Sequence, residues 1–370
     1  MSAGDAVPHP RLSYDLLGHE AAERVLLDAW NSGRIPHAWL IGGVAGIGKA
    51  TLAYRFARFV LAQGAEENGA EGGAAGLFGE APKPRSLEVP AGHPVSARVA
   101  SGGHGNLLVV ERVYDEKRKR VRQEILVDDA RRIGPFLRQT ASEGGWRVVV
   151  VDGADTMNAS SQNAILKLLE EPPARSLLLL TADNPGSLLP TIRSRCRKLR
   201  LDPLNEAVVE HLVARHRPDL PEAERAALCR LAEGSVGRAL ALAEAGGLKL
   251  YREIVDLIAA MPGLNTATAH AFADKLSRRG ADDAYETAVE LLVWWLGRLV
   301  QQAARGVAFA ETVPGEGALV TRLAALPRGL DRWMDVWEKV ARLFTRADNA
   351  NLDRKQVVLT ALGTIEAATA

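Results

Sequence analysis

The distribution of apolar residues divides the chain into two regions with different patterns. Up to about residue 201, short apolar runs alternate with segments of helical spacing, and the clearest runs are the valines at 146–152 and the leucines at 177–181. Near-continuous runs of this kind are typical of parallel strands buried on both faces. Strands that alternate with helices predict a doubly wound parallel α/β sheet.

The second region, beyond residue 201, has helical patterns alone. Short helices separated by proline or glycine are predicted at 206–216, 222–233 and 237–245. Longer helices follow from residue 250 and contain Trp294 and Trp295. One apolar stripe on them has the i, i+3, i+4 spacing of a buried helix face: Trp333, Val336, Trp337, Val340, Ala341 and Phe344. We expect these tryptophans to form a helix-bundle core, with a subunit interface as the alternative.

Three modules are predicted from these patterns. Residues 1–201 form an α/β domain, 202–246 a small helical lid and 247–370 an all-α collar domain. Within the first module, residues 63–105 are rich in Gly, Ala and Glu and then in Pro, which predicts a flexible insertion.

Between this insertion and the valine run, the apolar segments 107–110 and 124–127 flank a basic stretch and predict a hairpin with a basic tip. A helix is expected at 128–140. Another is expected at 158–171, where Asn158 is a suitable N-cap residue. A basic turn is usually a solvated turn, and direct contact with DNA is the alternative.

Composition narrows the class of protein. The chain has 46 basic and 45 acidic residues, so its net charge of +1 gives no global attraction to nucleic acid or membranes. Two cysteines do not indicate a disulfide framework and exclude a cysteine-rich zinc module. No apolar run approaches the ~18–20 residues that span a bilayer, and residues 1–12 lack the apolar core of a signal peptide. We therefore expect a cytoplasmic protein.

A phosphate-binding loop is the most informative motif. Residues 43–50 read Gly-Val-Ala-Gly-Ile-Gly-Lys-Ala and match G-x-x-x-x-G-K between a predicted strand and a predicted helix. Backbone N–H groups and the lysine of such a loop bind phosphate. Ala50 stands where a magnesium-binding Ser or Thr belongs, although Thr51 is adjacent.

The acid that would act with this loop is Asp152, at the end of the valine run. Gly153 follows it, where a hydrolysing oligomeric ATPase usually has Glu, and Asp155 lies two residues further on. We therefore expect ATP or ADP to bind weakly, with hydrolysis absent or very slow, and we predict no metal site. The predicted nucleotide-binding residues are Gly43, Gly46, Gly48, Lys49, Thr51 and Asp152.

Arg195, in Ser194-Arg195-Cys196, is the predicted catalytic residue, acting in trans on a neighbouring subunit. An arginine placed against a neighbour's γ-phosphate stabilises charge in the transition state. Four further cations surround it: Arg193, Arg197, Lys198 and Arg200. On its own, such an arginine is more often a surface salt-bridge partner, so this role depends on the whole set of motifs.

Together with the stretch 163–173, which ends in Leu-Leu-Glu-Glu-Pro-Pro, these motifs carry a family resemblance. Over about residues 12–245 the chain resembles the delta-prime family of bacterial DNA polymerase III clamp-loader subunits, within the AAA+ superfamily. The resemblance implies that Arg195 acts on a motor subunit, and the losses at Ala50 and Gly153 favour delta-prime over a motor subunit. Some relatives have four zinc-binding cysteines in the region of 63–105; here there are none, so no zinc is expected.

The resemblance also implies partners. These are the gamma/tau motor subunits and the delta subunit in a five-subunit ring, with the sliding clamp and primer-template DNA contacted through the complex. It places the Gly18-His19 region and residues 34–39 near the adenine side of a nucleotide. It makes 234–238 similar to the lid segment that supplies a second sensing arginine. The usual position of that arginine is Gly237 here, and Arg238 lies one residue late.

Three other readings remain open. The chain could be an ATP-hydrolysing gamma/tau-like motor subunit. It could be a P-loop kinase of small molecules, which would leave Ser-Arg-Cys and the helical third module unexplained. It could also bind DNA directly through 117–122 and the arginines near Arg195, which the balanced charge argues against.

Overall fold

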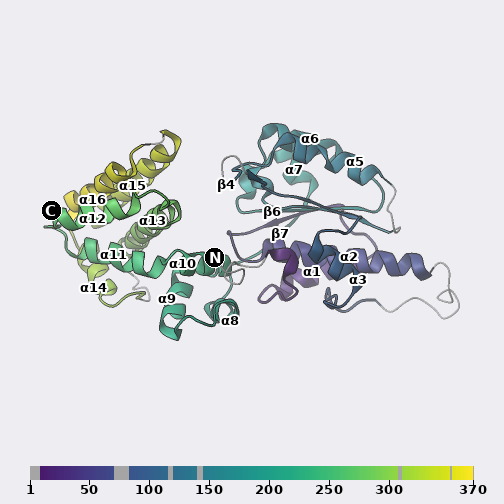
Figure 1. The fold of residues 1–370 in the computed structure, drawn as a ribbon, viewed down its shortest axis with the longest axis horizontal. Coiled ribbons are helices and arrows are strands. Elements are labelled where there is room, and N and C mark those ends of the chain that lie inside the picture. The colour runs from purple at the N-terminus through teal and green to yellow at the C-terminus, as the bar shows by residue number, and fades with distance from the viewer. Residues whose placement is uncertain are drawn as a thin grey trace. The chain divides into compact units, whose positions relative to one another are not determined.

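The computed structural model describes residues 9–70, 83–115, 120–139, 145–306, 311–350 and 352–369. The chain divides into two compact units (Figure 1). The first is Met1–Val208 with Ser235–Gly237, and the second is Val209–Gly234 with Arg238–Ala370. Most of the predicted lid and all of the predicted collar lie in the second unit, and the three-module division stays a prediction.

The first unit is built on a five-stranded sheet in the order β2-β5-β6-β1-β7. All neighbours in it are parallel, which confirms the predicted doubly wound α/β fold. Strands β1, β5 and β6 are buried along their whole length, as their apolar runs predict. The strands are β1 (Ala38–Gly42), β2 (Leu107–Val110), β5 (Arg147–Val151), β6 (Ser176–Ala182) and β7 (Arg197–Arg200).

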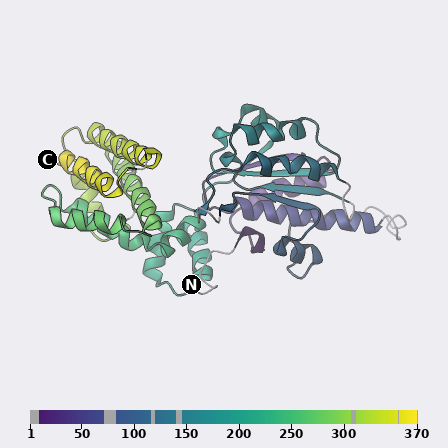
Figure 2. The ribbon, with the colours of Figure 1, turned by 45° about the horizontal axis from the view of Figure 1, so that its top comes forward.

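Helices cover both faces of this sheet (Figures 1 and 2). One face packs against α1 (Glu20–Asn31), α2 (Lys49–Ala70) and α3 (Pro94–Ser101). The other packs against α4 (Val127–Arg131), α5 (Ile133–Arg138), α6 (Ala159–Glu170) and α7 (Pro190–Arg195). The unit is therefore a three-layer sandwich whose core lies on both sides of the sheet.

The helix boundaries confirm one prediction and correct another. Helix α6 begins after Asn158, whose side chain accepts a hydrogen bond from the backbone N–H of Ser161, as an N-cap residue does. The single helix predicted at 128–140 is wrong, because α4 ends at Arg131 and α5 is a separate helix. Pro135 explains the break, since a proline ring clashes with the carbonyl four residues earlier, here that of Arg131.

The hairpin predicted from 107–110 and 124–127 is also wrong. β2 is an edge strand of the main sheet, parallel to β5. The segment 124–127 contributes only an isolated bridge between Ile125 and Met157. The hairpin that does form pairs β3 (Tyr114–Asp115) with β4 (Arg120–Val121), and the predicted basic tip at 116–119 lies outside the described residues.

The predicted flexible insertion at 63–105 is structured at both ends. Helix α2 continues to Ala70, and α3 buries Val95 and Val99 against the α2 face of the sheet. Helix α3 has a local explanation, because His93 caps its first turn and Gly102 ends it at φ 75°. The middle of the insertion, 71–82, lies outside the described residues.

The second unit has helices and no strands among its described residues, as predicted. Its core consists of the buried faces of the long helices, and Trp295 and Trp333 are fully buried in it. The helices from α8 onward are α8 (Glu206–His216), α9 (Glu222–Ala232), α10 (Val236–Glu244), α11 (Gly247–Ala259), α12 (Thr266–Leu276), α13 (Asp282–Arg305), α14 (Glu316–Ala324), α15 (Gly329–Ala350) and α16 (Arg354–Thr369). Among the described residues, no helix has the length and apolar character needed to cross a membrane.

A buried polar network ties α11 to α14 in this unit. Glu316 is fully buried and accepts hydrogen bonds from the Tyr251 hydroxyl and, at 2.8 Å, from the backbone N–H of Thr312. Burial, followed by the nearby Glu316 charge, raises the pKa of Tyr251 well above its usual range. Tyr251 therefore stays a neutral donor to the carboxylate.

The two tryptophans of the α15 stripe have different environments, which generates a prediction. Trp333 is fully buried and its indole N–H donates to the Leu323 carbonyl at 2.8 Å, whereas Trp337 is 38% exposed. We expect Trp333→Ala to lower the free energy of unfolding by about 3–5 kcal/mol. The matched change Trp337→Ala on the same helix should cost about 1 kcal/mol. Urea unfolding followed by circular dichroism measures both, and equal losses would contradict this division of the stripe.

Candidate functional site

The predicted phosphate loop joins β1 to α2, so the strand–loop–helix context of the motif is confirmed. Gly46 and Gly48 have φ angles of 74° and 103°, a region that favours glycine. The N–H of Gly43 donates to the Ala182 carbonyl at 3.3 Å, which fixes the start of the loop beside β6. Thr51 lies half-buried in the first turn of α2. Gly46 and Gly48 therefore have backbone angles that other residues rarely adopt.

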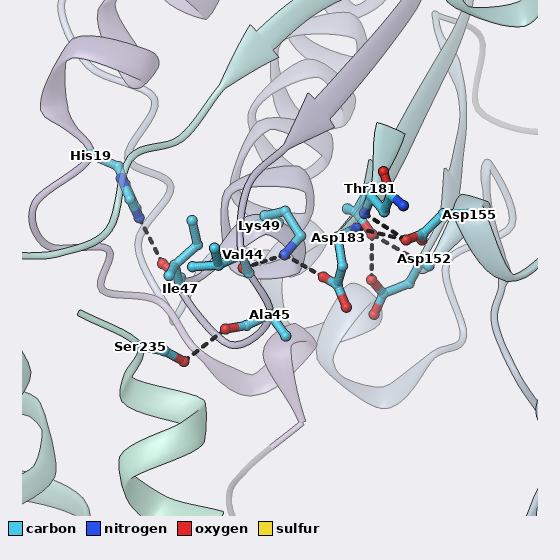
Figure 3. Close-up of polar contacts among 12 residues, drawn as sticks. His19, Val44, Ala45, Ile47, Lys49, Asp152, Asp155, Thr181, Asp183 and Ser235 are labelled. Carbon is cyan, nitrogen blue, oxygen red and sulfur yellow. Dashed lines mark hydrogen bonds and ion pairs between the residues drawn. The ribbon is translucent and has the colours of Figure 1, made fainter. Parts of the chain in front are cut away.

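The lysine of the loop is engaged within the chain. Lys49 is the first residue of α2 and is only 6% exposed. Its ammonium donates to the Val44 carbonyl at 2.6 Å and forms an ion pair with the Asp183 carboxylate, also at 2.6 Å (Figure 3). Asp183 follows the end of β6, the strand next to β1. The sequence prediction identified Lys49 but not its acidic partner.

The predicted metal-side acid, Asp152, is hydrogen-bonded to the neighbouring strand. Its carboxylate accepts from the Thr181 hydroxyl at 2.6 Å, and that same hydroxyl oxygen accepts from the backbone N–H of Gly153 at 2.9 Å. Thr181 thus connects the ends of β5 and β6. Asp155 points to the loop after β6, where it accepts from the backbone N–H groups of Asp183 at 3.0 Å and Asn184 at 2.8 Å. It therefore holds the loop that carries Asp183.

Three backbone carbonyls of the phosphate loop accept hydrogen bonds from residues outside the loop. The Ser235 hydroxyl donates to the Ala45 carbonyl at 2.7 Å, and the Gly237 N–H donates to the Gly46 carbonyl at 2.9 Å. The buried His19 ring donates through Nε2 to the Ile47 carbonyl at 2.6 Å. A Cβ atom at Gly237 would lie 2.8 Å from the Gly46 Cα, so glycine permits this close approach.

The lid arginine has its partners in the second unit. Arg238 belongs to the second unit, where its Nε lies 2.9 Å from the Glu290 carboxylate on α13 and its guanidinium stands over the Trp294 ring. Gly237, one residue earlier, is the position that contacts the phosphate loop. The sensing role suggested for Arg238 stays a prediction, and its side chain has partners within its own unit.

Arg195 brings together two motifs that the sequence presents separately. It ends α7, and its guanidinium pairs with Glu170 at 2.8 Å and donates to the Thr191 carbonyl at 3.1 Å. Glu170 ends α6 and belongs to the Leu-Leu-Glu-Glu-Pro-Pro stretch. The Arg195 side chain remains 35% exposed. It is therefore held in one orientation and is still accessible.

Cys196, the last residue of the same tripeptide, has a structural position. It is 7% exposed and packs in the core between the sheet and α4–α7. Burial raises the pKa of its thiol to about 12. The tripeptide thus contains a buried cysteine next to a partly exposed arginine.

The residues present fit a nucleotide's phosphates better than they fit a magnesium ion. The loop backbone and Lys49 are the groups that bind phosphate. At the metal side, Ala50 has no hydroxyl, and one carboxylate oxygen of Asp152 accepts from Thr181. Within the ranges that the structure describes, no group of three or more His, Cys, Asp or Glu residues could hold a metal ion.

The sequence is similar to a known protein family and to several of its members. Residues 18–205 match the family model described as DNA polymerase III, delta subunit. The chain is 36% identical over 199 residues to DNA polymerase III subunit delta′ of Pseudomonas aeruginosa, covering 54% of this chain and 53% of that protein. The Escherichia coli delta′ subunit is 33% identical over 217 residues, covering 59% and 57%. The chain thus spans about half the length of the delta′ relatives that it matches.

The chain is also similar to a tau subunit. The tau subunit of Escherichia coli DNA polymerase III is 29% identical over 240 residues, which cover 64% of this chain and 33% of tau.

The buried thiols generate a prediction about reactivity. With a pKa of about 12, only about one Cys196 side chain in 10⁴ is a thiolate at pH 8. Because Cys229 is also buried, the folded chain should react with iodoacetamide much more slowly than the urea-unfolded chain. Mass spectrometry of the alkylated peptides measures both sites. Rapid alkylation of Cys196 in the folded protein at pH 8 would contradict its burial.

Proposed function

The chain belongs to the DNA polymerase III delta subunit family, whose model matches about half of it, and from this premise we propose that it is a delta-prime subunit of a bacterial clamp loader. In this role it donates Arg195 to the nucleotide site of a neighbouring motor subunit and does not hydrolyse ATP itself. One contrast carries the proposal: Arg195 is oriented and accessible, whereas the chain's own site lacks its hydrolytic groups.

The chain's own site supports nucleotide binding without turnover. Hydrolysis by a phosphate-loop enzyme needs a magnesium ion held by a hydroxyl and an acid, and a group that positions the attacking water. Ala50 removes the hydroxyl, Asp152 is hydrogen-bonded to Thr181, and Gly153 has no side chain to position water. The loop and Lys49 would hold the phosphates of ATP or ADP weakly.

Arg195 has the properties required to act on a neighbour. A guanidinium remains charged and donates several hydrogen bonds from a planar fork, which suits the oxygens of a transferring phosphoryl group. Glu170 and the Thr191 carbonyl orient this fork at the end of α7. Because the pair is partly exposed, an incoming anion can compete with Glu170 at low cost.

The proposed partners follow from the family. They are gamma/tau motor subunits and a delta subunit in a five-subunit ring, with the helical second unit providing a collar. Through this ring the chain supports loading of the sliding clamp onto primer-template DNA in the cytoplasm. The two delta′ relatives and the tau relative support membership of such a complex.

The second candidate function is that of a gamma/tau-like motor subunit, which the retained Lys49 and the similarity to tau favour. It requires ATP turnover by the chain alone, in the presence of clamp and primed DNA, that Lys49→Ala abolishes. The missing hydroxyl at Ala50 argues against it.

The proposal predicts a selective effect of Arg195. In a ring reconstituted with motor and delta subunits, Arg195→Ala should slow hydrolysis at the site it faces by at least about 10³-fold. Steady-state ATP turnover of the ring should therefore fall by the share of that one site, while the ring still assembles on size exclusion. The control is Arg197→Ala, which removes an exposed arginine two residues away and should leave turnover unchanged. Equal turnover in both variants would refute the role in trans.

A further inference from the structure

The ammonium of Lys49 already has a negatively charged partner inside the chain. At 6% exposure it has little contact with water, and two of its three N–H donors are directed at Val44 and Asp183. Both distances are 2.6 Å, so both contacts are short hydrogen bonds from a charged donor. A phosphate group bound by this lysine would have to share it with Asp183 or replace the aspartate.

The position of Asp183 is built into the loop that follows β6. Its own backbone N–H and that of Asn184 donate to Asp155, and the Asn184 side chain accepts from the Gly186 N–H at 3.1 Å. Figure 3 shows Asp183 between Lys49 on one side and Asp152 with Asp155 on the other. Because its backbone is held this way, the carboxylate lies within reach of Lys49, although 58% of the Asp183 side chain remains exposed.

The other side of the loop is tied as well. The hydrogen bonds from Ser235 and Gly237 to the Ala45 and Gly46 carbonyls fix two successive peptide units of the motif. These hydrogen bonds therefore hold the loop backbone in place, while Asp183 balances the charge of Lys49.

We propose that Asp183 is an internal competitor for the phosphate loop, whose carboxylate lies where it opposes any phosphate that Lys49 would bind. The inference rests on the proposed function in one respect, namely that the ligand of this loop is a nucleotide. It adds that low affinity comes from a specific acid of this chain and not only from the missing hydroxyl at residue 50. The phosphate loop therefore keeps its lysine, and one ion pair opposes the binding of phosphate there.

Asp183 opposes nucleotide binding in two ways. The nucleotide must displace a hydrogen-bonded ion pair, and its phosphates then lie beside a carboxylate of like charge. Asparagine at 183 keeps the size of the side chain and removes the charge. Because the change removes both the like charge and the charged hydrogen-bond partner of Lys49, Asp183→Asn should raise nucleotide affinity by about tenfold.

Fluorescence titration of the full chain with ADP and ATP carrying a fluorescent ribose label, with and without Mg²⁺, tests this. We expect tighter binding of both nucleotides by Asp183→Asn, and we expect Lys49→Met to remove the gain when combined with it. The matched control is Asp202→Asn, which neutralises an acid that is 81% exposed and pairs with Arg200, and which should bind like the wild type. Thermal unfolding confirms that each variant is folded, and Asp183→Ala provides a second test if Asp183→Asn is unstable.

Unchanged or weaker binding by the folded Asp183 variants would overturn the proposal, as would the absence of binding by every variant. An equal gain from Asp202→Asn would also overturn it, because the effect would then be one of general charge. These outcomes are independent of the Arg195 experiment. If Arg195→Ala leaves ring turnover unchanged while Asp183→Asn binds nucleotide more tightly, the trans role fails and the internal competitor stands.

Discussion

The first unit depends on one constraint: in a parallel sheet, the carboxyl ends of all strands lie on the same side of the sheet. β1 lies between β6 and β7, and β5 lies on the other side of β6. The loop after β1 carries Lys49, and the ends of β5 and β6 carry Asp152 and Asp183. These charged groups therefore meet beside one another although they are far apart in sequence. The hydrogen bonds of Thr181 and Asp155 on this side of the sheet follow from the same arrangement.

Local patterns predicted the parts of the fold that local interactions decide. The valine and leucine runs became β5 and β6, and Asn158 caps α6 as its position suggests. The errors arose where the decisive contact is distant or where one residue overrides a pattern. Nothing within 107–110 specifies pairing with β5 rather than with 124–127, and Pro135 divides a segment whose apolar spacing reads as one helix.

In the candidate site, too, the contiguous residues were predictable and their distant partners were not. The phosphate loop is recognised from contiguous residues, because its glycines and lysine act through local backbone geometry. The partners of the loop are not contiguous: Ser235 hydrogen-bonds Ala45 across 190 positions. One signal for Asp183 was nevertheless present. It is an acid close after a buried apolar strand, the same reasoning that identified Asp152, and adjacent parallel strands place their ends together.

Arg195 and Lys49 are both paired with carboxylates, but Lys49 is much more buried. This difference affects how readily each side chain can bind an external anion. The Arg195–Glu170 pair is 35% and 48% exposed, so it contributes only about 0–1 kcal/mol to stability and serves mainly to orient the guanidinium. Lys49 is almost fully buried, so leaving it unpaired would be costly, whereas its partner Asp183 is 58% exposed. An external anion can therefore replace Glu170 at Arg195 at little cost, whereas at Lys49 it competes with Asp183 for a buried ammonium. This difference supports the proposal that the arginine acts on another subunit's site while the chain's own site does not turn over ATP.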